Sequence, residues 1–154
     1  MALAAAPRKF AMSAVLHPLE PPIPSAWHRR RVLLVEDNAF IIELLRLVLN
    51  QHSEVLLATD AASGWAVAQR ERPDVVITDL CFGAGMSGHE LLQAMRADAL
   101  LADTPVLVIS AHAKPADVET SLALGAQAHM GKPFSPLHLL RWLEALWAEQ
   151  RTEP

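Results

Sequence analysis

A regular alternation of short apolar runs with longer amphipathic stretches constrains the fold of this chain more than any other feature. The apolar runs cover residues 32–35, 55–58, 75–78, 105–109 and 126–130. Continuous runs of this length are typical of strands that are buried on both faces of a parallel sheet. The stretches between them have helical spacing, as in Ile41, Leu44, Leu45 and Val48. Five strands alternating with five helices predict an α/β fold, in which a parallel sheet has helices on both faces and right-handed crossovers.

Capping residues, prolines and one glycine set the expected ends of the helices. The predicted helices run from Asn38 to Asn50, from a cap at Asp60 to about Glu71, from a cap at Ser87 to about Ala97, from Pro115 to a stop at Gly125, and onward from Ser135 and Pro136.

The composition excludes several classes of protein. The only cysteine is Cys81, so no intrachain disulfide can form. No apolar run approaches the roughly 18 residues of a membrane span, and the net charge of −4 implies no general affinity for nucleic acid or anionic membrane. The N-terminus lacks the pattern of a secretory signal, so we expect a cytoplasmic protein.

The first 28 residues differ from the rest of the chain. They contain five prolines at positions 7, 18, 21, 22 and 24, and they show no sustained period. Such segments resist helix and sheet formation, so we expect a flexible N-terminal arm. The predicted organisation is this arm over residues 1–28, one domain over residues 29–150, and a short tail over residues 151–154.

Polar residues follow the ends of the predicted strands. They are Glu36, Asp37 and Asn38 after the first strand, Asp79 after the third, Ser110 after the fourth, and Lys132 with Pro133 after the fifth. In open parallel sheets, ligands bind beyond the carboxyl ends of the strands. Crowded carboxylates repel one another, and a hard divalent ion such as Mg²⁺ relieves that repulsion. A carboxylate can also act as a nucleophile that carries a phosphoryl group, while a lysine and a hydroxyl stabilise its oxygens.

These strand-end residues form a set of motifs that resembles the receiver domain of response regulators. The motifs are residues 32–38, Thr78-Asp79-Leu80, Gly85-Met86-Ser87-Gly88, residues 108–111, Gly125-Ala126 and Lys132-Pro133-Phe134. Each motif is weak alone, but their order and spacing are specific, and the resemblance covers about residues 31–146. It implies a flavodoxin-like sheet with strand order 2-1-3-4-5.

The resemblance also implies a role for each matching residue. Asp79 is expected to accept the phosphoryl group, with Lys132 paired to that group and Ser110 as the switch hydroxyl. Asp37 is expected to ligate Mg²⁺ directly, Glu36 mostly through water, and Cys81 through its backbone carbonyl. The expected donor is a histidine kinase or a histidine phosphotransfer protein. The domain would catalyse its own phosphorylation and autodephosphorylation without being a conventional enzyme.

The sequence departs from the family pattern at two places. The loop after Asp79 is about one residue longer than usual and lacks the usual proline, so we expect an altered loop with intact chemistry. The switch aromatic is replaced by His129, whose imidazole is polar and titrates near neutral pH. Two interpretations of His129 stay open at this point: a partly exposed strand residue, or a residue with a role in switching.

The last predicted helix is apolar on more than one face, through Leu137, Leu139, Leu140, Trp142, Leu143, Leu146 and Trp147. Such a helix is either buried or in contact with a partner. By resemblance, the surface of the fourth helix, fifth strand and fifth helix is expected to form a homodimer or bind a target protein. The alternative is that these side chains pack against the N-terminal arm.

The leading functional hypothesis is a single-domain response regulator of a two-component phosphorelay. It would switch a protein–protein interaction, with no nucleic-acid or membrane partner. The alternative is an interaction module that works without phosphorylation, suggested by His129 and the unusual loop. A flavodoxin-like nucleotide or flavin binder fits less well, because no glycine-rich phosphate loop follows the first strand.

Overall fold

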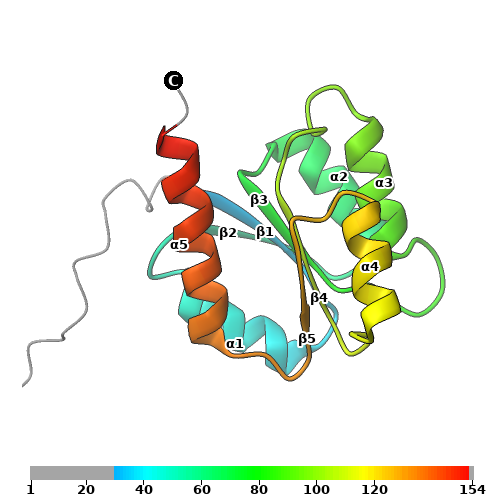
Figure 1. The fold of residues 1–154 in the computed structure, drawn as a ribbon, viewed down its shortest axis with the longest axis horizontal. Helices are drawn as coiled ribbons and strands as arrows, with labels where there is room; N and C mark the ends of the chain where they lie inside the picture. The colour runs from blue at the N-terminus through cyan, green and yellow to red at the C-terminus, as the bar shows by residue number, and fades with distance from the viewer. Residues whose placement is uncertain (1–29, 153–154) are drawn as a thin grey trace, which may run out of the picture.

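The computed structural model describes residues 30–152 and shows a five-stranded parallel sheet in the order β2-β1-β3-β4-β5 (Figure 1). The strands are β1 (Arg31–Val35), β2 (Glu54–Ala58), β3 (Val75–Thr78), β4 (Val106–Ser110) and β5 (Ala128–Gly131). The helices are α1 (Ala39–Leu49), α2 (Ala61–Glu71), α3 (Gly88–Ala97), α4 (Pro115–Ala123) and α5 (Pro136–Thr152). The predicted fold class and strand order are therefore confirmed.

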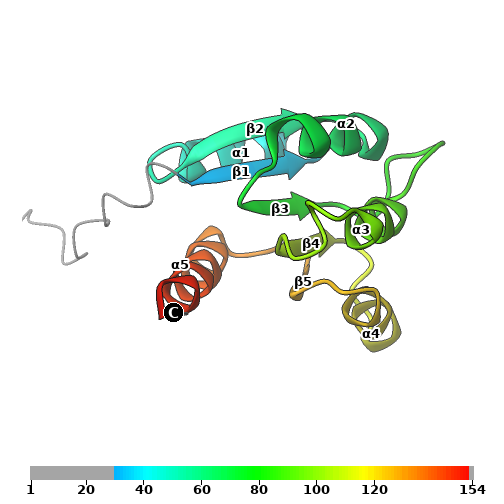
Figure 2. The ribbon, with the colours of Figure 1, turned by 90° about the horizontal axis from the view of Figure 1, so that it is seen from above.

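Alternate side chains of each strand enter two separate cores, one on either face of the sheet. In Figure 2, α5 lies on one side of the sheet, and α3 and α4 lie on the other. Val32 and Leu34 of β1 pack with α1 and α5, through residues that include Leu45 and Trp147. One core therefore joins the sheet to α1 and α5. The neighbouring residues of the same strand, Leu33 and Val35, face the other core, where α2 and α3 contribute Ala61, Ala68, Leu91, Leu92 and Met95.

Side-chain caps begin three of the helices at predicted positions. Asn38 Oδ1 accepts from the Ile41 N–H at 3.2 Å, and Asp60 Oδ1 accepts from the Ser63 N–H at 2.7 Å. Ser87 and Glu90 form a capping box at the start of α3. Each such cap stabilises its helix by about 1 kcal/mol. The cap at Asn38 also sets where the chain turns after the acidic residues that end β1.

Two predicted boundaries differ from the observed ones by two residues. The fifth strand begins at Ala128 rather than Ala126, because Gly125, at a φ of +103°, turns the chain and the Ala126 N–H is still bonded to the Ser121 carbonyl. The last helix continues to Thr152, two residues past the predicted end of the domain. The predicted N-terminal arm lies outside the described residues.

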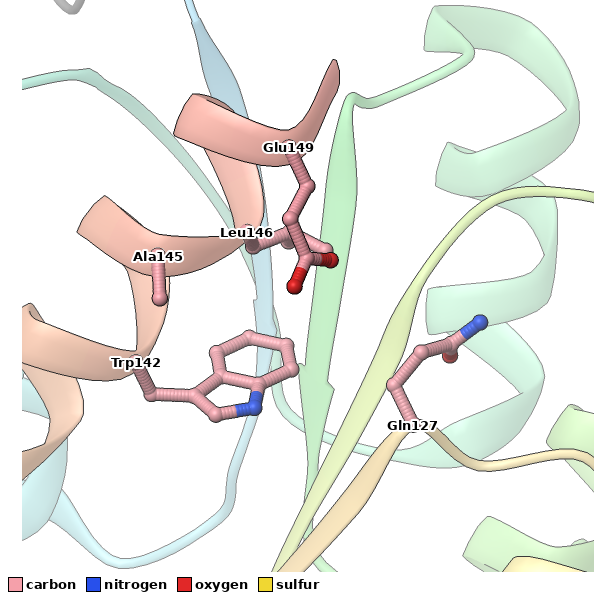
Figure 3. A pocket seen from close by; sticks show the side chains of 5 residues that line it. All are labelled: Gln127, Trp142, Ala145, Leu146 and Glu149. Carbon is pink, nitrogen blue, oxygen red and sulfur yellow. The ribbon is translucent and has the colours of Figure 1, made fainter. Parts of the chain in front are cut away.

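The apolar α5 is only partly explained by burial. Leu139, Leu143 and Trp147 are buried in the core, while Leu137 is 52% exposed. The half-buried Trp142 and Leu146 line an open cavity of about 290 Å³ beside the start of β5, together with Gln127, Ala145 and Glu149 (Figure 3). The sheet and α5 thus leave an open hollow on this side of the domain, lined by both apolar and polar side chains.

Candidate functional site

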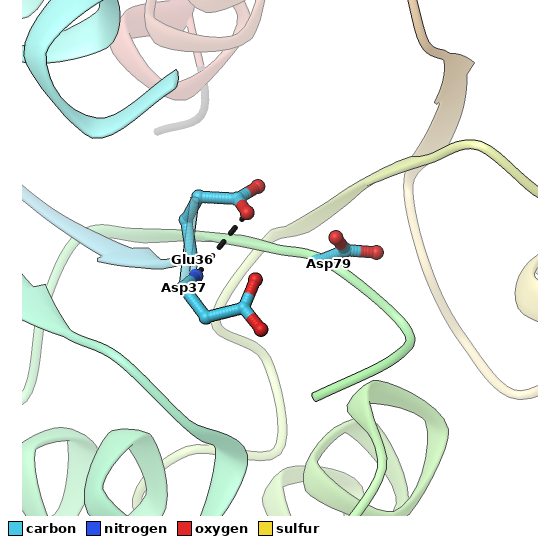
Figure 4. A group of neighbouring side chains, drawn as sticks. All are labelled: Glu36, Asp37 and Asp79. Carbon is cyan, nitrogen blue, oxygen red and sulfur yellow. Dashed lines mark hydrogen bonds between the residues drawn. The ribbon is translucent and has the colours of Figure 1, made fainter. Parts of the chain in front are cut away.

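Three carboxylates meet at the carboxyl end of the sheet, where β1 and β3 lie side by side (Figure 4). Oxygens of Glu36, Asp37 and Asp79 lie within 4.8 Å of one another. Glu36 is 2% exposed and Asp79 is 9% exposed, whereas Asp37 is exposed to solvent. The parallel register of β1 and β3, with Val35 opposite Thr78, brings the residues after each strand together, as the sequence predicted.

Lys132, which follows β5, reaches across to this cluster. Its Nζ donates to Asp79 Oδ2 at 2.7 Å and to Glu36 Oε2 at 2.9 Å. Burial lowers the pKa of Lys132, but the hydrogen bonds and charges of Asp79 and Glu36 outweigh it, so its pKa is raised from 10.5. Three carboxylates with one ammonium leave an excess of negative charge, which favours a further cation at the site.

Backbone N–H groups hold the two buried carboxylates in place. Asp79 Oδ1 accepts from the Leu80 N–H at 2.6 Å and from the Cys81 N–H at 3.4 Å. Glu36 Oε1 accepts from the N–H groups of Asp37 and Asn38 at 3.2 and 3.0 Å. These bonds restrict the rotation of both side chains, so the carboxylate oxygens of Asp79 have a defined position.

Ser110 ends β4 and is fully buried, with 0% exposure. Its Oγ accepts from the His112 N–H at 3.1 Å, and its carbonyl accepts from the Lys132 N–H at 2.9 Å. The backbones of Ser110 and Lys132 are therefore tied together at the same edge of the sheet. The structure places Ser110 beside the cluster without a direct bond from its side chain to Asp79 in the described part of the chain.

Cys81 is exposed and its thiol is unpaired among residues 30–152. Its one contact with the cluster is the long bond from its N–H to Asp79, so the expectation that its carbonyl ligates a metal stays a prediction. Asp37 offers a free carboxylate within the described residues, as expected of a direct metal ligand.

His129 lies on β5 and is partly exposed, as one interpretation expected, and its side chain also has a hydrogen-bonding partner. Its Nδ1 is 2.9 Å from the Oγ of Ser121 on α4, which is also 2.9 Å from the Nε2 of His89 on α3. Sequence reasoning missed Ser121 and His89. The only available signal was a serine among apolar residues of α4, which alone is weak.

The comparisons with known proteins agree with the geometry. Residues 32–144 match the family model of the response regulator receiver domain. The chain belongs to this family, and it is a receiver domain of the kind found in the response regulators of two-component systems. Receiver domains bind Mg²⁺ at an acidic pocket, and Glu36, Asp37 and Asp79 form an acidic cluster in this chain.

The curated relatives include DNA-binding response regulators. MtrA of Mycolicibacterium paratuberculosis is 30% identical over 127 residues, covering 82% of this chain and 55% of the relative. The phosphate regulon transcriptional regulatory protein PhoB of Pseudomonas aeruginosa is 31% identical over 126 residues, covering 81% of this chain and 54% of the relative. The chain thus spans about half the length of the curated relatives that it matches.

Solved receiver structures are similar over nearly their whole length. The chemotaxis response regulator CheY4 of Vibrio cholerae is 32% identical with a TM-score of 0.70, covering 75% of this chain and 97% of that chain. A CheY-like receiver domain protein from Methanospirillum hungatei is 27% identical with a TM-score of 0.73, covering 81% and 98%. Between residues 30 and 152, no helix is both long and apolar enough to cross a membrane.

Proposed function

We propose that this domain accepts a phosphoryl group on Asp79 from a phosphohistidine, in the presence of Mg²⁺, and thereby changes its binding to a protein target. The observation that carries the proposal is the Asp79 carboxylate, which is held at 2.7 Å from the Lys132 ammonium inside a cluster of three carboxylates. A structural salt bridge needs one acid for one base, and the surplus of acids here instead suits a metal and a phosphoryl group.

The transfer needs one nucleophile and a positively charged surrounding. A carboxylate oxygen of Asp79 attacks the phosphorus, a P–O bond forms as the P–N bond of the phosphohistidine breaks, and the imidazole nitrogen leaves with the electron pair and takes up a proton. Attack of water on the same phosphorus would release inorganic phosphate and regenerate Asp79. The N–H groups of Leu80 and Cys81 hold the carboxylate in position throughout.

Lys132 and Ser110 act on the phosphoryl oxygens. Lys132 already donates to Asp79, so its ammonium is placed to pair with the negative charge that arrives there. Ser110 accepts from the His112 N–H, which leaves its own proton to donate to a phosphoryl oxygen. Each new bond stabilises the phosphorylated form over the free form, which is how the modification shifts a conformational equilibrium.

The donor set fits Mg²⁺. Carboxylate oxygens of Asp37 and Asp79 would hold the ion, with Glu36 acting through water and the Cys81 carbonyl as a further ligand. When bound, the ion neutralises charge on the phosphoryl oxygens. Its removal would leave the carboxylates opposed by Lys132 alone.

The exposed apolar side of α1 gives the donor protein a place to dock. Phe40 is 77% exposed and Leu47 is 68% exposed, and Phe40 lies three residues after Asp37. Apolar residues this exposed, at the rim of the reactive site, suit the helical surface of a protein that presents a phosphohistidine. The donor would be a histidine kinase or a histidine phosphotransfer protein.

The downstream target and the cellular location are proposed in general terms. Similarity to CheY4 supports the single-domain form and a protein target, while the curated relatives are DNA-binding regulators, so the predicted absence of a nucleic-acid partner stays a prediction. The hollow beside Trp142 and Leu146 supports dimerisation or target binding at the α4, β5 and α5 surface. We place this activity in the cytoplasm, where two-component phosphorelays operate.

A second function, an interaction module independent of phosphorylation, is favoured by one observation. His129 is already bonded to the buried Ser121 in the unphosphorylated protein, so the switch position is occupied before any transfer. Under that function, target binding would be the same in the native protein and in Asp79→Asn.

The test is labelling with acetyl phosphate and Mg²⁺, followed by intact mass. We expect the native protein to gain one phosphoryl group, Asp79→Asn to gain none, and the matched control Asp103→Asn, an exposed acid away from the cluster, to label normally. Phe40→Ala should label normally with acetyl phosphate but more slowly with a phosphorylated donor protein. A native protein that gains no mass, or an Asp79→Asn variant that does, contradicts the proposal.

A further inference from the structure

Two helices, α3 and α4, and the strand β5 meet at one buried hydroxyl, on the opposite side of the sheet from α1. Ser121 has 0% exposure and is the buried residue of α4. Its Oγ lies 2.9 Å from His89 Nε2 of α3 and 2.9 Å from His129 Nδ1 of β5. We call His89, Ser121 and His129 the histidine–serine cluster. It joins α4 to both of its neighbours through a single oxygen.

Counting protons shows that this arrangement suits two neutral imidazoles. The serine hydroxyl has one proton, so it donates to one ring nitrogen and accepts from the N–H of the other. Neutral imidazole offers one N–H and one bare nitrogen, and two tautomers therefore complete both bonds. The cluster needs no charge to be satisfied.

Protonation disturbs this arrangement at two points. An imidazolium carries an N–H on both nitrogens, and His129 Nε2 is buried with no partner among the described residues. A charged His129 would therefore bury an unpaired N–H, which is costly. The two ring nitrogens that contact Ser121 share one oxygen at 2.9 Å each, so two charged rings would also repel one another at close range.

The groups that act on His89 come from its own burial and from two other elements. Burial lowers the pKa of His89, and the charge of His129 on β5 lowers it further, while Asp117 on α4 raises it. The net result is a pKa below the ordinary value of 6.5. One acid thus partly offsets the burial and the repulsion. The neutral form of His89 is favoured in the folded domain.

We propose that the histidine–serine cluster is an acid-sensitive clamp, which holds α4 against α3 and β5 while His89 is neutral and releases α4 when His89 is protonated. The clamp does not involve Asp79, Lys132 or a metal. It goes beyond the proposed phosphoryl transfer, because the conformation of the α4 and β5 surface would then depend on pH as well as on phosphorylation.

The sign of the pH effect follows from the direction of the shift. Because the folded state binds a proton on His89 less readily than the unfolded state, the contribution of the clamp is fully present above about 6.5 and is lost as the pH falls below that value. Acid therefore weakens the packing of α4, and neutral pH restores it.

The first measurement is an NMR titration of the histidine ring nitrogens in the unphosphorylated native protein. We expect the pKa of His89 to lie below 6.5, the ordinary value for histidine, and the backbone amides of α4 and β5 to shift together with His89. The proposal is wrong if His89 titrates at or above that ordinary value, or if the α4 amides do not follow it. This measurement requires no variant to fold.

The second measurement is urea unfolding between about pH 7.5 and about pH 5.5, the range over which histidine titrates. His89→Gln keeps a hydrogen-bonding group without a charge, and His138→Gln on α5 is the matched control. We expect the unfolding equilibrium constant to rise on acidification at least about threefold more in the native protein and His138→Gln than in His89→Gln. Equal pH dependence in all three proteins would overturn the clamp.

Discussion

Lys132 and Arg96 lie at opposite ends of the same sheet and show how differently a cation can be used. Lys132, at the carboxyl end, is paired with the carboxylates of Glu36 and Asp79. Arg96, on α3, reaches the loops that precede β4 and β5. Within the described part of the chain it donates only to neutral oxygens, those of Leu101, Ala102, Thr104, Gly125 and Gln127.

The difference lies in whether the partners can change charge. Carbonyl oxygens do not change charge during a reaction, so Arg96 holds the loops that precede β4 and β5 in one conformation. Burial lowers the pKa of Arg96, and the charge of Asp103 opposes that shift; among residues 30–152, Arg96 makes no salt bridge to a carboxylate. The partners of Lys132 are the groups that would gain a phosphoryl group or a metal. We therefore expect Lys132 to control activity and Arg96 to control stability.

The largest expected effect is on labelling at the carboxyl end. Lys132→Met removes the ammonium but keeps most of the side-chain volume, and we expect the rate of labelling by acetyl phosphate to fall about 100-fold, as for the loss of one preorganised electrostatic group. Intact mass over time measures it. Lys114→Met, at an exposed lysine, is the control and should label at the native rate. An unchanged labelling rate in Lys132→Met would contradict the expectation that Lys132 controls activity.

The next effect is on stability at the amino end. Arg96→Ala leaves several carbonyl oxygens in two loops without their donor, and we expect a loss of about 2–4 kcal/mol in the free energy of unfolding by urea. Arg46→Ala, at an exposed ion pair of 3.8 Å on α1, should change it by less than about 0.5 kcal/mol. The folded fraction of Arg96→Ala should label at the native rate. Slower labelling would mean that Arg96 also affects activity, and not stability alone.

The smallest effect is the response to alkaline pH. The pKa of Lys132 is raised from 10.5 by its two carboxylates, so its stabilising contribution is complete below that value and is lost as the pH rises through the higher folded-state value. Urea unfolding from about pH 9 to about pH 11 should show this loss in the native protein and less of it in Lys132→Met. Equal loss in both proteins would mean that Lys132 is not coupled to the cluster.

Sequence reasoning predicted the parts of the molecule that depend on local pattern. Val32 to Val35 and Val75 to Thr78 form strands because they are apolar throughout, and a parallel sheet then brings Glu36, Asp37 and Asp79 to one edge whatever the loops do. The fold and the acidic cluster were therefore accessible without coordinates.

The parts that were missed depend on which side chains meet in space. An arginine on a helix, such as Arg96, has the same local pattern whether it is solvated or bound to loop carbonyls. Ser121, His89 and His129 come from three elements, and only tertiary packing shows that they share one hydrogen-bonding centre. The early start predicted for β5 failed because the Ala126 N–H is still bonded to the Ser121 carbonyl of α4, although Ala126 is apolar like the strand residues that follow.

The exposure of Asp37 beside the buried Glu36 and Asp79 has a kinetic consequence. If the cluster holds the proposed Mg²⁺, the solvent-exposed Asp37 carboxylate gives the ion a route from bulk water. The speed of ion exchange is then limited by the reluctance of the ion to give up its water, rather than by an opening motion of the protein. The readiness of Asp79 to react would follow the free divalent ion concentration of the surroundings from moment to moment, while the domain stays folded.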